Sequence, residues 1–253
     1  MSTDTLGDRM KSYEQVTRTV LLPHSWTVLR VDGRAFHAYL RRADKPFDLD
    51  FIRDMQLVGA DLCREVSGVV YTYGQSDEIS LILSDVDQQS QPWFGGVAQK
   101  MASVAAGVAT ASLIGQRGWS GRPHFDARVF TLPSVVEVAN YLIWRQRDAV
   151  RNSISMAAQA KFSHAALHGK NSNDMQEMLW AEHGVNWNDY PDECRRGWVV
   201  TRAVREGEVT FTDRRTGVVQ TTTALRTFWE PGPAPHFTVD ALMPILEAST
   251  DER

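Results

Sequence analysis

The sequence predicts an α+β fold in which helices pack on an antiparallel sheet, in the ferredoxin-like order βαββαβ. Three observations predict this fold. Two runs rich in β-branched and aromatic residues, 69–73 and 79–83, flank a short polar turn and predict a hairpin. A segment with helical periodicity precedes this hairpin, and an alanine-rich helical segment follows it. One strand-like run precedes the first helix and another follows the second, which completes the order.

Each element of the first half has a local signal. The first strand, 26–34, runs into Asp32-Gly33, and Gly74 is expected to supply the positive φ of the hairpin turn. The first helix can be capped by Asp48 or Asp50 and ends at Gly68. Its apolar face consists of Phe51, Met55, Val58, Leu62 and Val66.

Small residues fill the second helix, 93–114, which can therefore pack closely on a sheet. The segment 115–123 breaks this helix, and the next strand is predicted at 125–130. An antiparallel sheet with helices on one face, built in this order, is the palm of many polymerases and nucleotide cyclases. We therefore predict a palm domain in residues 1–132.

The character of the chain changes after Pro133. Ser134-Val135-Val136-Glu137 is typical of a capping box and predicts a helix through Asp148. Ser172, Asn173 or Asp174 can cap a short helix at 175–182. Short strands are predicted at 198–204, 209–212 and 218–222, followed by a stiff connector with Pro231, Pro233 and Pro235 and an acidic helix. Residues 133–253 thus form a second region, which can also pack with the palm as one domain.

Composition limits the function classes. With 253 residues, 43% of them hydrophobic, the chain can form one large domain or two small ones. The net charge of −4 gives no general basic signature, so any nucleic-acid binding must use a local patch. The two cysteines lack zinc-type spacing and suit a reducing compartment. Because the first 18 residues resemble no signal peptide and no run is long enough to span a membrane, we expect a cytoplasmic protein without membrane contact.

Two acidic residues are expected to meet at one edge of the sheet. Asp32 follows a predicted strand, and Asp77-Glu78 stand at the mouth of the hairpin. If the two strands are neighbours, Asp32 and Asp77 converge, and Gly33 leaves its carbonyl open to a ligand because it has no Cβ. Two carboxylates, a carbonyl and phosphate oxygens suit Mg²⁺, and two such ions catalyse phosphoryl transfer. The alternative is structural, with one Asp capping a turn and the other in a surface ion pair.

The most basic stretch is residues 141–170. Its basic residues are Arg145, Arg147, Arg151, Lys161 and Lys170, against the single acid Asp148. One interpretation is a track for a nucleic-acid phosphate backbone, and the other is an ordinary solvated helix face. His164 and His168 are interpreted as surface or packing residues, because the sequence does not place the further ligands that a metal pair needs.

Five stretches of the chain also form one ordered set. They are Arg30-Val31-Asp32-Gly33-Arg34-Ala35-Phe36-His37, Lys45-Pro46-Phe47-Asp48, Tyr73-Gly74-Gln75-Ser76-Asp77-Glu78-Ile79-Ser80, Phe125-Asp126-Ala127-Arg128 and Trp144-Arg145-Gln146-Arg147-Asp148. Together they resemble the tRNA-histidine guanylyltransferase superfamily, including the bacterial and archaeal members called Thg1-like proteins. The resemblance covers about residues 10 to 200.

The resemblance implies a polymerase palm that adds nucleotides in the 3′–5′ direction to the 5′ end of tRNA. Such enzymes activate a 5′-monophosphate with ATP or GTP. The 3′-hydroxyl of an incoming nucleoside triphosphate, such as GTP, then attacks the activated end, and a final step removes the diphosphate. The resemblance further implies two Mg²⁺ ions and a homotetramer built of dimers.

Site residues follow from the same resemblance. Asp32, Asp77 and the Gly33 carbonyl would hold the two Mg²⁺ ions, with Glu78 as a catalytic residue beside them. The nucleotide would be lined by Arg34, Ala35, Phe36, His37, Lys45, Asp48 and Ser76. A second triphosphate or the tRNA 5′ end would contact Arg30, Lys100, Arg128 and Arg145. The C-terminal region would bind tRNA through Arg147, Arg151, Asn152, Lys161, Lys170, Arg195 and Arg196. Asp48 could instead cap a helix, and His37 could instead be a packed core histidine.

Two departures from the family pattern bear on the substrate. The guanylyltransferases proper carry a His-Ile-Asn-Asn run that recognises the histidine anticodon, where this chain has Val150-Arg151-Asn152-Ser153. The family also carries two basic residues after Trp-Phe, where this chain has Gly95-Gly96. The basic residue of the family pattern at Lys100 is kept. Both departures favour the Thg1-like branch, whose members restore missing 5′ nucleotides on several tRNAs by Watson–Crick templating.

Three other functions stay open. The first is the addition of a single G at position −1 of histidine tRNA. The second is a nucleotide cyclase, because Gly-Gln-Ser-Asp-Glu resembles the Gly-Gly-Asp-Glu hairpin of those enzymes, although a basic C-terminal region would then have no purpose. The third is an RNA-binding protein without catalysis, against which the intact Asp32, Gly33 and Asp77 argue.

Overall fold

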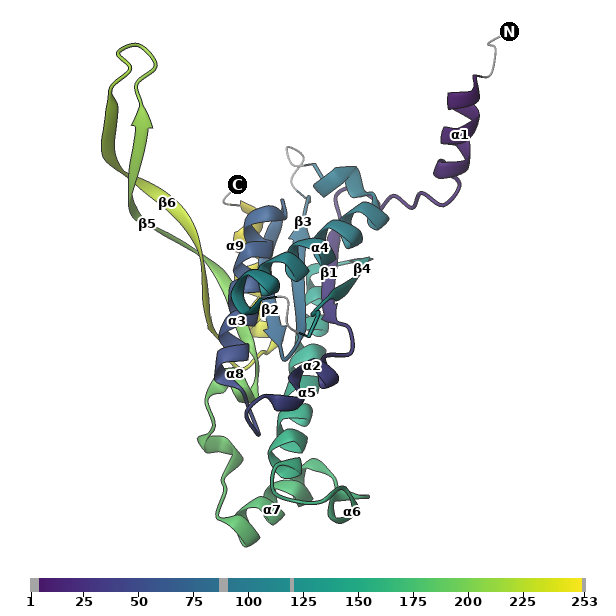
Figure 1. The fold of residues 1–253 in the computed structure, drawn as a ribbon, viewed down its shortest axis with the longest axis vertical. Coiled ribbons are helices and arrows are strands. Elements are labelled where there is room, and N and C mark those ends of the chain that lie inside the picture. Colours follow the sequence, from purple (N-terminus) through teal and green to yellow (C-terminus); the bar gives the residue numbers. More distant parts are fainter. Residues whose placement is uncertain (1–4, 87–90, 119–120, 252–253) are drawn as a thin grey trace.

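A single antiparallel sheet organises the protein. The structure, a computed structural model, describes residues 5–86, 91–118 and 121–251. The strands are β1 (Trp26–Gly33), β2 (Val69–Gln75), β3 (Glu78–Ser84), β4 (Phe125–Leu132), β5 (Trp198–Thr212) and β6 (Val219–Pro233). Their order in the sheet is β4-β1-β3-β2-β5-β6 (Figure 1). The first four strands of this order form the ferredoxin-like arrangement, so the predicted α+β palm is confirmed.

Helices precede, connect and follow the strands. The longer ones are α1 (Leu6–Gln15), α3 (Leu49–Glu65), α4 (Ala98–Arg117), α5 (Val135–Gln159), α7 (Ser172–His183) and α9 (Val239–Asp251). The short α-helices are α2 (Phe36–Tyr39), α6 (His164–Leu167) and α8 (Asp192–Arg195). The 3₁₀ helices are η1 (Leu40–Arg42), η2 (Trp93–Gly96) and η3 (Trp187–Asp189). Within the described ranges, no helix combines the length and the apolar character needed to cross a membrane.

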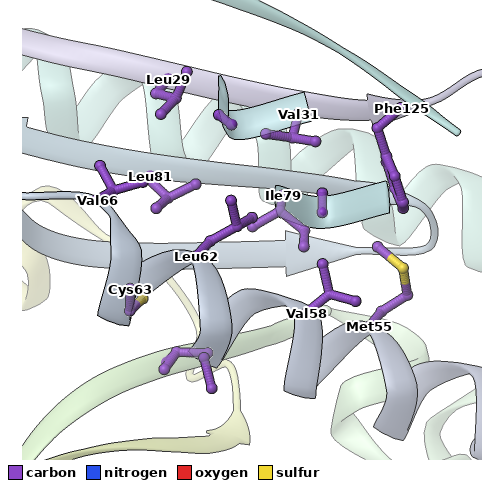
Figure 2. Packing of buried hydrophobic residues seen from close by; sticks show 14 of the residues in the cluster. Leu29, Val31, Met55, Val58, Leu62, Cys63, Val66, Ile79, Leu81 and Phe125 are labelled. Carbon is purple, nitrogen blue, oxygen red and sulfur yellow. The ribbon is translucent and has the colours of Figure 1, made fainter. Parts of the chain in front are cut away.

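Both faces of the sheet are covered. On one face, the predicted apolar side of α3 is buried and packs with α4 against alternate residues of β1 and β3, including Val31, Ile79 and Leu81 (Figure 2). On the other face, α5 and α9 pack against residues such as Val28 and Ile82. The sequence predicted helices on one face only, because the second layer comes from the C-terminal half. A sheet with one buried face would leave apolar residues such as Val28 and Ile82 without a covering layer, and this second layer buries them.

The hairpin turn lies two residues later than predicted. Gln75 pairs with Glu78, so Ser76 and Asp77 form a two-residue loop in which Ser76, not Gly74, has the positive φ of 49°. Gly74 lies within β2 and is required for another reason. A Cβ on Gly74 would lie 2.2 Å from the Trp198 ring, which packs directly on this backbone.

Several helix ends differ from the prediction. Asp48 caps α3 by accepting a hydrogen bond from Phe51 N, which settles the choice between Asp48 and Asp50. The cap of α7 is Asn171 rather than any of the three residues predicted. The second helix starts at Ala98, because the backbone of Phe94, Gly95 and Gly96 has positive φ. Each difference reflects a local hydrogen bond or dihedral angle that periodicity does not encode.

The C-terminal strands form one long hairpin. β5 and β6 pair from Trp198–Pro233 to Thr212–Val219, and β5 joins the palm sheet beside β2. Figure 1 shows this hairpin extending beyond the sheet as an arm, while α1 projects on the other side of the molecule. The predicted proline connector is wrong in part, since Pro231 and Pro233 belong to β6. Proline is tolerated there because β6 is an edge strand.

Candidate active site

Charged residues gather where β1 ends. In the strand register Asp32 lies opposite Glu78 on one side and Asp126 on the other, so these three carboxylates face the α5 side of the sheet. Two pairs earlier along the strands, Arg30 lies opposite Arg128 on the same face. Burial first, and then Asp126, raise the pKa of Asp32, while the arginines oppose them.

Asp77 lies against the end of β1 as predicted. Gly33 N donates to Asp77 O at 3.0 Å, and a Cβ on Gly33 would lie 2.8 Å from Asp77 Oδ2. The Ser76 hydroxyl donates to Asp77 Oδ1 at 3.0 Å. Burial raises the pKa of Asp77 to about 6, and the carboxylates of Asp32 and Glu78 act in the same direction. The turn therefore holds a carboxylate that would be stabilised by a cation.

This set of donors fits Mg²⁺. Among the described residues neither Asp32 nor Asp77 forms an ion pair, and no three His, Cys, Asp or Glu side chains are grouped as a ligand set. The protein thus offers two carboxylates, with Gly33 at the end of β1 bonded to the backbone of Asp77. Mg²⁺ is commonly held by one or two carboxylates together with substrate phosphates, so this small set is sufficient.

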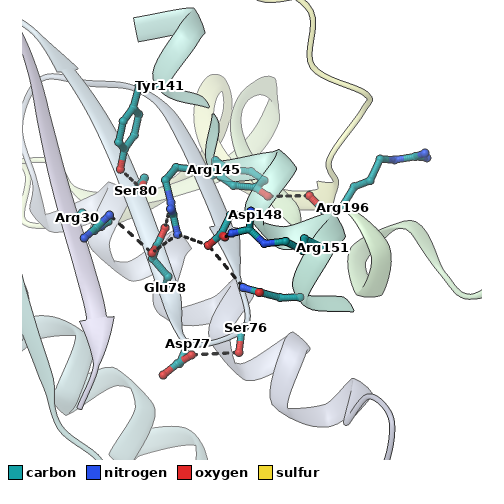
Figure 3. A network of polar contacts seen from close by, with 12 residues as sticks. Arg30, Ser76, Asp77, Glu78, Ser80, Tyr141, Arg145, Asp148, Arg151 and Arg196 are labelled. Carbon is teal, nitrogen blue, oxygen red and sulfur yellow. Dashed lines mark hydrogen bonds and ion pairs between the residues drawn. The ribbon is translucent and has the colours of Figure 1, made fainter. Parts of the chain in front are cut away.

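Glu78 has a different environment from Asp32 and Asp77. Arg145 Nε and Nη2 each donate to one Glu78 carboxylate oxygen at 2.7 Å, and Arg30 lies 3.9 Å away (Figure 3). Arg145 also donates to Asp148 at 3.1 Å, and Asp148 in turn pairs with Arg151. The buried pair of Arg145 and Glu78 ties β3 to α5. Asp148 is not among the site residues predicted from the sequence, although its position three residues after Arg145 on a helix is a usable signal.

Two hollows adjoin the carboxylates. An open cleft of about 390 Å³ is lined by Asp32, Asp77, Glu78 and residues of α5. A smaller, largely apolar pocket of about 80 Å³ lies between the loop 43–48, the start of α3 and α5. The residues that line both hollows are Gln75, Ser76, Asn152 and Met156. One ligand with an apolar ring and an anionic tail could therefore occupy both.

The predicted nucleotide residues divide into two groups. Lys45, Asp48 and Ser76 line the small pocket. The segment that follows Gly33 is anchored by Phe36, whose ring is buried against Tyr39, Phe51 and Phe125. Arg34, Ala35 and His37 are exposed beside that anchor, so His37 is not a packed core histidine.

The residues predicted for a second triphosphate are not all together. Arg30 and Arg145 contact Glu78, and Arg128 lies 3.9 Å from Asp126. Lys100 lies over the Phe94 ring near the start of α4, whereas Arg117 at the end of α4 pairs with Asp48. Lys100 is therefore roughly 25 Å away along the helix axis from the end that approaches the site. Within one copy of the chain, the structure does not bring Lys100 to the carboxylates.

The predicted tRNA-binding residues do not form one continuous track. Arg151 pairs with Asp148, and both Arg195 and Arg196 pair with Asp192. Asn152 lines the cleft in front of the carboxylates, whereas Arg147 lines a separate groove beside His236. Lys161 and Lys170 are exposed beyond the end of α5, as are His164 and His168.

The fold and the site define a nucleotidyltransferase with a palm sheet. Its acids lie at the end of the first strand and in the adjoining hairpin turn, next to a pocket of mixed character. A family model described as Thg1, tRNAHis guanylyltransferase, matches residues 7–133. The chain belongs to this family.

Individual relatives agree. A probable tRNA(His) guanylyltransferase of Drosophila melanogaster is 30% identical over 213 residues, which cover 76% of this chain and 72% of the relative. A solved bacterial Thg1-like protein in complex with ATP is 34% identical, with a TM-score of 0.82, and covers 97% of this chain and 98% of its own. The corresponding structure in complex with GTP has a TM-score of 0.78 at 34% identity, over 96% and 98% of the two chains.

Proposed function

We propose that this protein adds nucleotides in the 3′–5′ direction to the 5′ end of tRNA, copying the opposite strand to repair incomplete ends. The observation that supports this most directly is the carboxylate pair of Asp32 and Asp77 beside Gly33, next to the apolar pocket. The names of the relatives support tRNA as the substrate. The ATP and GTP bound to the bacterial Thg1-like protein support nucleoside triphosphates.

The residues of the chain suit such a reaction. The pocket beside Phe47 and Lys45 can receive a nucleobase, while the wider cleft leads its phosphates toward Asp32 and Asp77. Mg²⁺ held by the two carboxylates and the Gly33 carbonyl would neutralise phosphate oxygens and lower the pKa of the attacking 3′-hydroxyl. Glu78 acts as a positioning residue, because both of its oxygens are engaged by Arg145.

The environment of residues 150–153 favours templated repair over selection of the histidine anticodon. Ser153 is buried and accepts from Trp187 Nε1 at 3.1 Å, while its single O–H lies within donating distance of Val150 O at 2.9 Å and Arg195 O at 3.1 Å. Val150 packs in the same apolar cluster. Val150 and Ser153 stand at two positions of the run that reads the anticodon in the guanylyltransferases proper. In this chain both residues therefore pack against the rest of the protein.

A gel assay with the full-length protein tests the proposal. The substrate is tRNA lacking its first nucleotide, with a 5′-monophosphate or a 5′-triphosphate, incubated with Mg²⁺ and each nucleotide in turn. We expect extension only by the base complementary to the acceptor strand, and loss of extension in Asp32→Ala and Asp77→Ala. Addition of G alone, restricted to histidine tRNA, would instead identify the G−1 enzyme.

The same assay decides among the remaining alternatives. Product formed from nucleotide without RNA would indicate a cyclase, and RNA binding without any extension would indicate a non-catalytic protein. The two Mg²⁺ ions, the homotetramer and the cytoplasmic location stay predictions. Metal titration, light scattering and cell fractionation would test them in turn.

A further inference from the structure

Unpaired positive charge gathers on a surface that the predicted tRNA-binding residues do not include. Segments 34–45 and 121–124 together hold four arginines and one lysine but only one acid, Asp44, in a chain of net charge −4. Within the described ranges, none of these five basic residues forms an ion pair. Arg41, Arg42 and Arg122 are exposed and have no assigned role. We call these three residues with His124 the α2–β4 patch.

The two segments lie side by side. Arg34 N donates to His124 O at 3.0 Å, and a Cβ on Gly121 would lie 2.6 Å from the Tyr39 ring. A hollow of about 370 Å³ between the segments is lined in part by Arg42, Tyr39 and Gly121. Residues more than 80 positions apart in the chain thus form one surface.

Arg34 links this surface to the carboxylates. His124 Nδ1 lies 2.9 Å from Arg122 O, which can only accept, so Nδ1 carries the proton and Nε2 accepts from Arg34 Nη1 at 3.4 Å. Gly33 pairs with Phe125 in the β1–β4 register, which sets His124 directly beside the end of β1. The α2–β4 patch therefore begins next to the site at which the 5′ end would react.

We propose that the α2–β4 patch binds the phosphate backbone of an RNA duplex, the acceptor stem that leads into the site. This inference rests on the proposed function, because it names the surface along which that substrate lies. Exposed arginines without acidic partners suit a polyanion, since binding releases counterions from the phosphates and breaks no ion pair of the protein. By contrast, Arg145, Arg151, Arg195 and Arg196 already have carboxylate partners.

Three triple variants test the inference. The patch variant is Arg41→Gln/Arg42→Gln/Arg122→Gln. A charge-matched control, Arg202→Gln/Arg214→Gln/Arg215→Gln, lies on the β5–β6 hairpin, and a competing variant is Arg147→Gln/Lys161→Gln/Lys170→Gln. Affinity for an acceptor-stem RNA duplex is measured by fluorescence anisotropy from 50 to 300 mM KCl. Melting temperature and GTP binding verify that each variant is folded.

In the patch variant we expect binding to weaken by about tenfold or more near 0.1 M salt. The slope of log K against log salt should become smaller by about one for each lost phosphate contact. The hairpin control should match the wild type. In extension assays the patch variant should raise KM for RNA while leaving kcat and KM for the nucleotide unchanged.

Unchanged RNA affinity and salt slope in the patch variant would overturn the inference. So would an equal loss in the hairpin control, or a loss confined to the competing variant. The two proposals fail separately. Patch-dependent binding without any extension contradicts only the proposed function, normal extension with patch-independent binding contradicts only the inference, and a wild type that binds no RNA contradicts both.

Discussion

Arg145 and Glu78 form a two-pronged, buried ion pair in which Nε and Nη2 donate to separate carboxylate oxygens at 2.7 Å. The Arg145 side chain is 7% exposed and the Glu78 side chain 10%. The pair joins α5 to the strand that follows the Ser76-Asp77 turn. The two residues are 67 positions apart in the chain, so a long-range contact helps to hold the site together.

Removing one partner of this pair should destabilise the protein. Arg145→Ala leaves the Glu78 carboxylate buried with only the more distant Arg30, so we expect a loss of about 3–5 kcal/mol in the free energy of unfolding. Urea unfolding of Arg145→Ala, Glu78→Gln and the double variant measures the coupling between the two residues. Additive effects of the two single changes would show that the pair contributes no coupling.

Asp77 should make the stability of the metal-free protein depend on pH. Its pKa of about 6 lies above the ordinary value of 3.8, so the folded state binds this proton more tightly than the unfolded chain. The contribution of Asp77 is then most favourable below about pH 4 and is lost as the pH rises toward 6 and above. Asp77→Asn should therefore raise the free energy of unfolding at pH 7.5 by at most about 3 kcal/mol, seen as a higher melting temperature, and have little effect at pH 4.

The same variant should respond less than the wild type to ligands that bind at Asp77. Mg²⁺ with GTP should stabilise the wild type at pH 7.5, because binding to the folded state shifts the unfolding equilibrium. The same addition should stabilise Asp77→Asn less. Equal stabilisation of the two proteins would show that Asp77 does not hold the metal.

Gly74 should not tolerate a side chain. Gly74→Ala places a Cβ 2.2 Å from the Trp198 ring, and we expect a loss of at least about 1–3 kcal/mol from overpacking. Gly107→Ala is the matched control, because no atom lies within 4 Å of its Cβ and the residue lies inside α4. The control should gain about 0.5–1 kcal/mol from helix propensity. Thermal unfolding of both variants decides whether close packing or glycine entropy dominates at residue 74.

Gly33→Ala should impair the chemistry. Its Cβ would lie 2.5 Å from the Phe36 ring and 2.8 Å from Asp77 Oδ2, so the carboxylate and the loop must move apart. A displacement of this size at a reacting centre can reduce kcat by about 100-fold. Single-turnover extension of tRNA measures the effect, and an unchanged rate would show that the reaction tolerates a displacement of Asp77.

From the sequence, the apolar face of α3 and the alternation in β3 predicted which residues are buried. The spacing of apolar residues shows which side of a helix or strand faces the core. The sequence also predicted Asp32 and Asp77 at one edge, because Asp32 lies near the end of β1 and Asp77 directly precedes β3. It could not show that Gly74 faces Trp198, which lies 124 residues later in the chain, or that Arg145 pairs with Glu78. The helix α5 carries several arginines, and only its rotation against the sheet decides which are neutralised.

What the sequence alone determined is therefore local: the strands, the apolar helix faces, the acids beside strand ends and the ordered stretches that the family shares. The tertiary structure alone decided which charges have partners. The arginines of α5 that suggested a phosphate track are in part bound to Glu78 and Asp148, while Arg41, Arg42 and Arg122 remain without ion pairs in the described structure. Ion pairing depends on distances between side chains far apart in the chain, which composition and spacing do not contain.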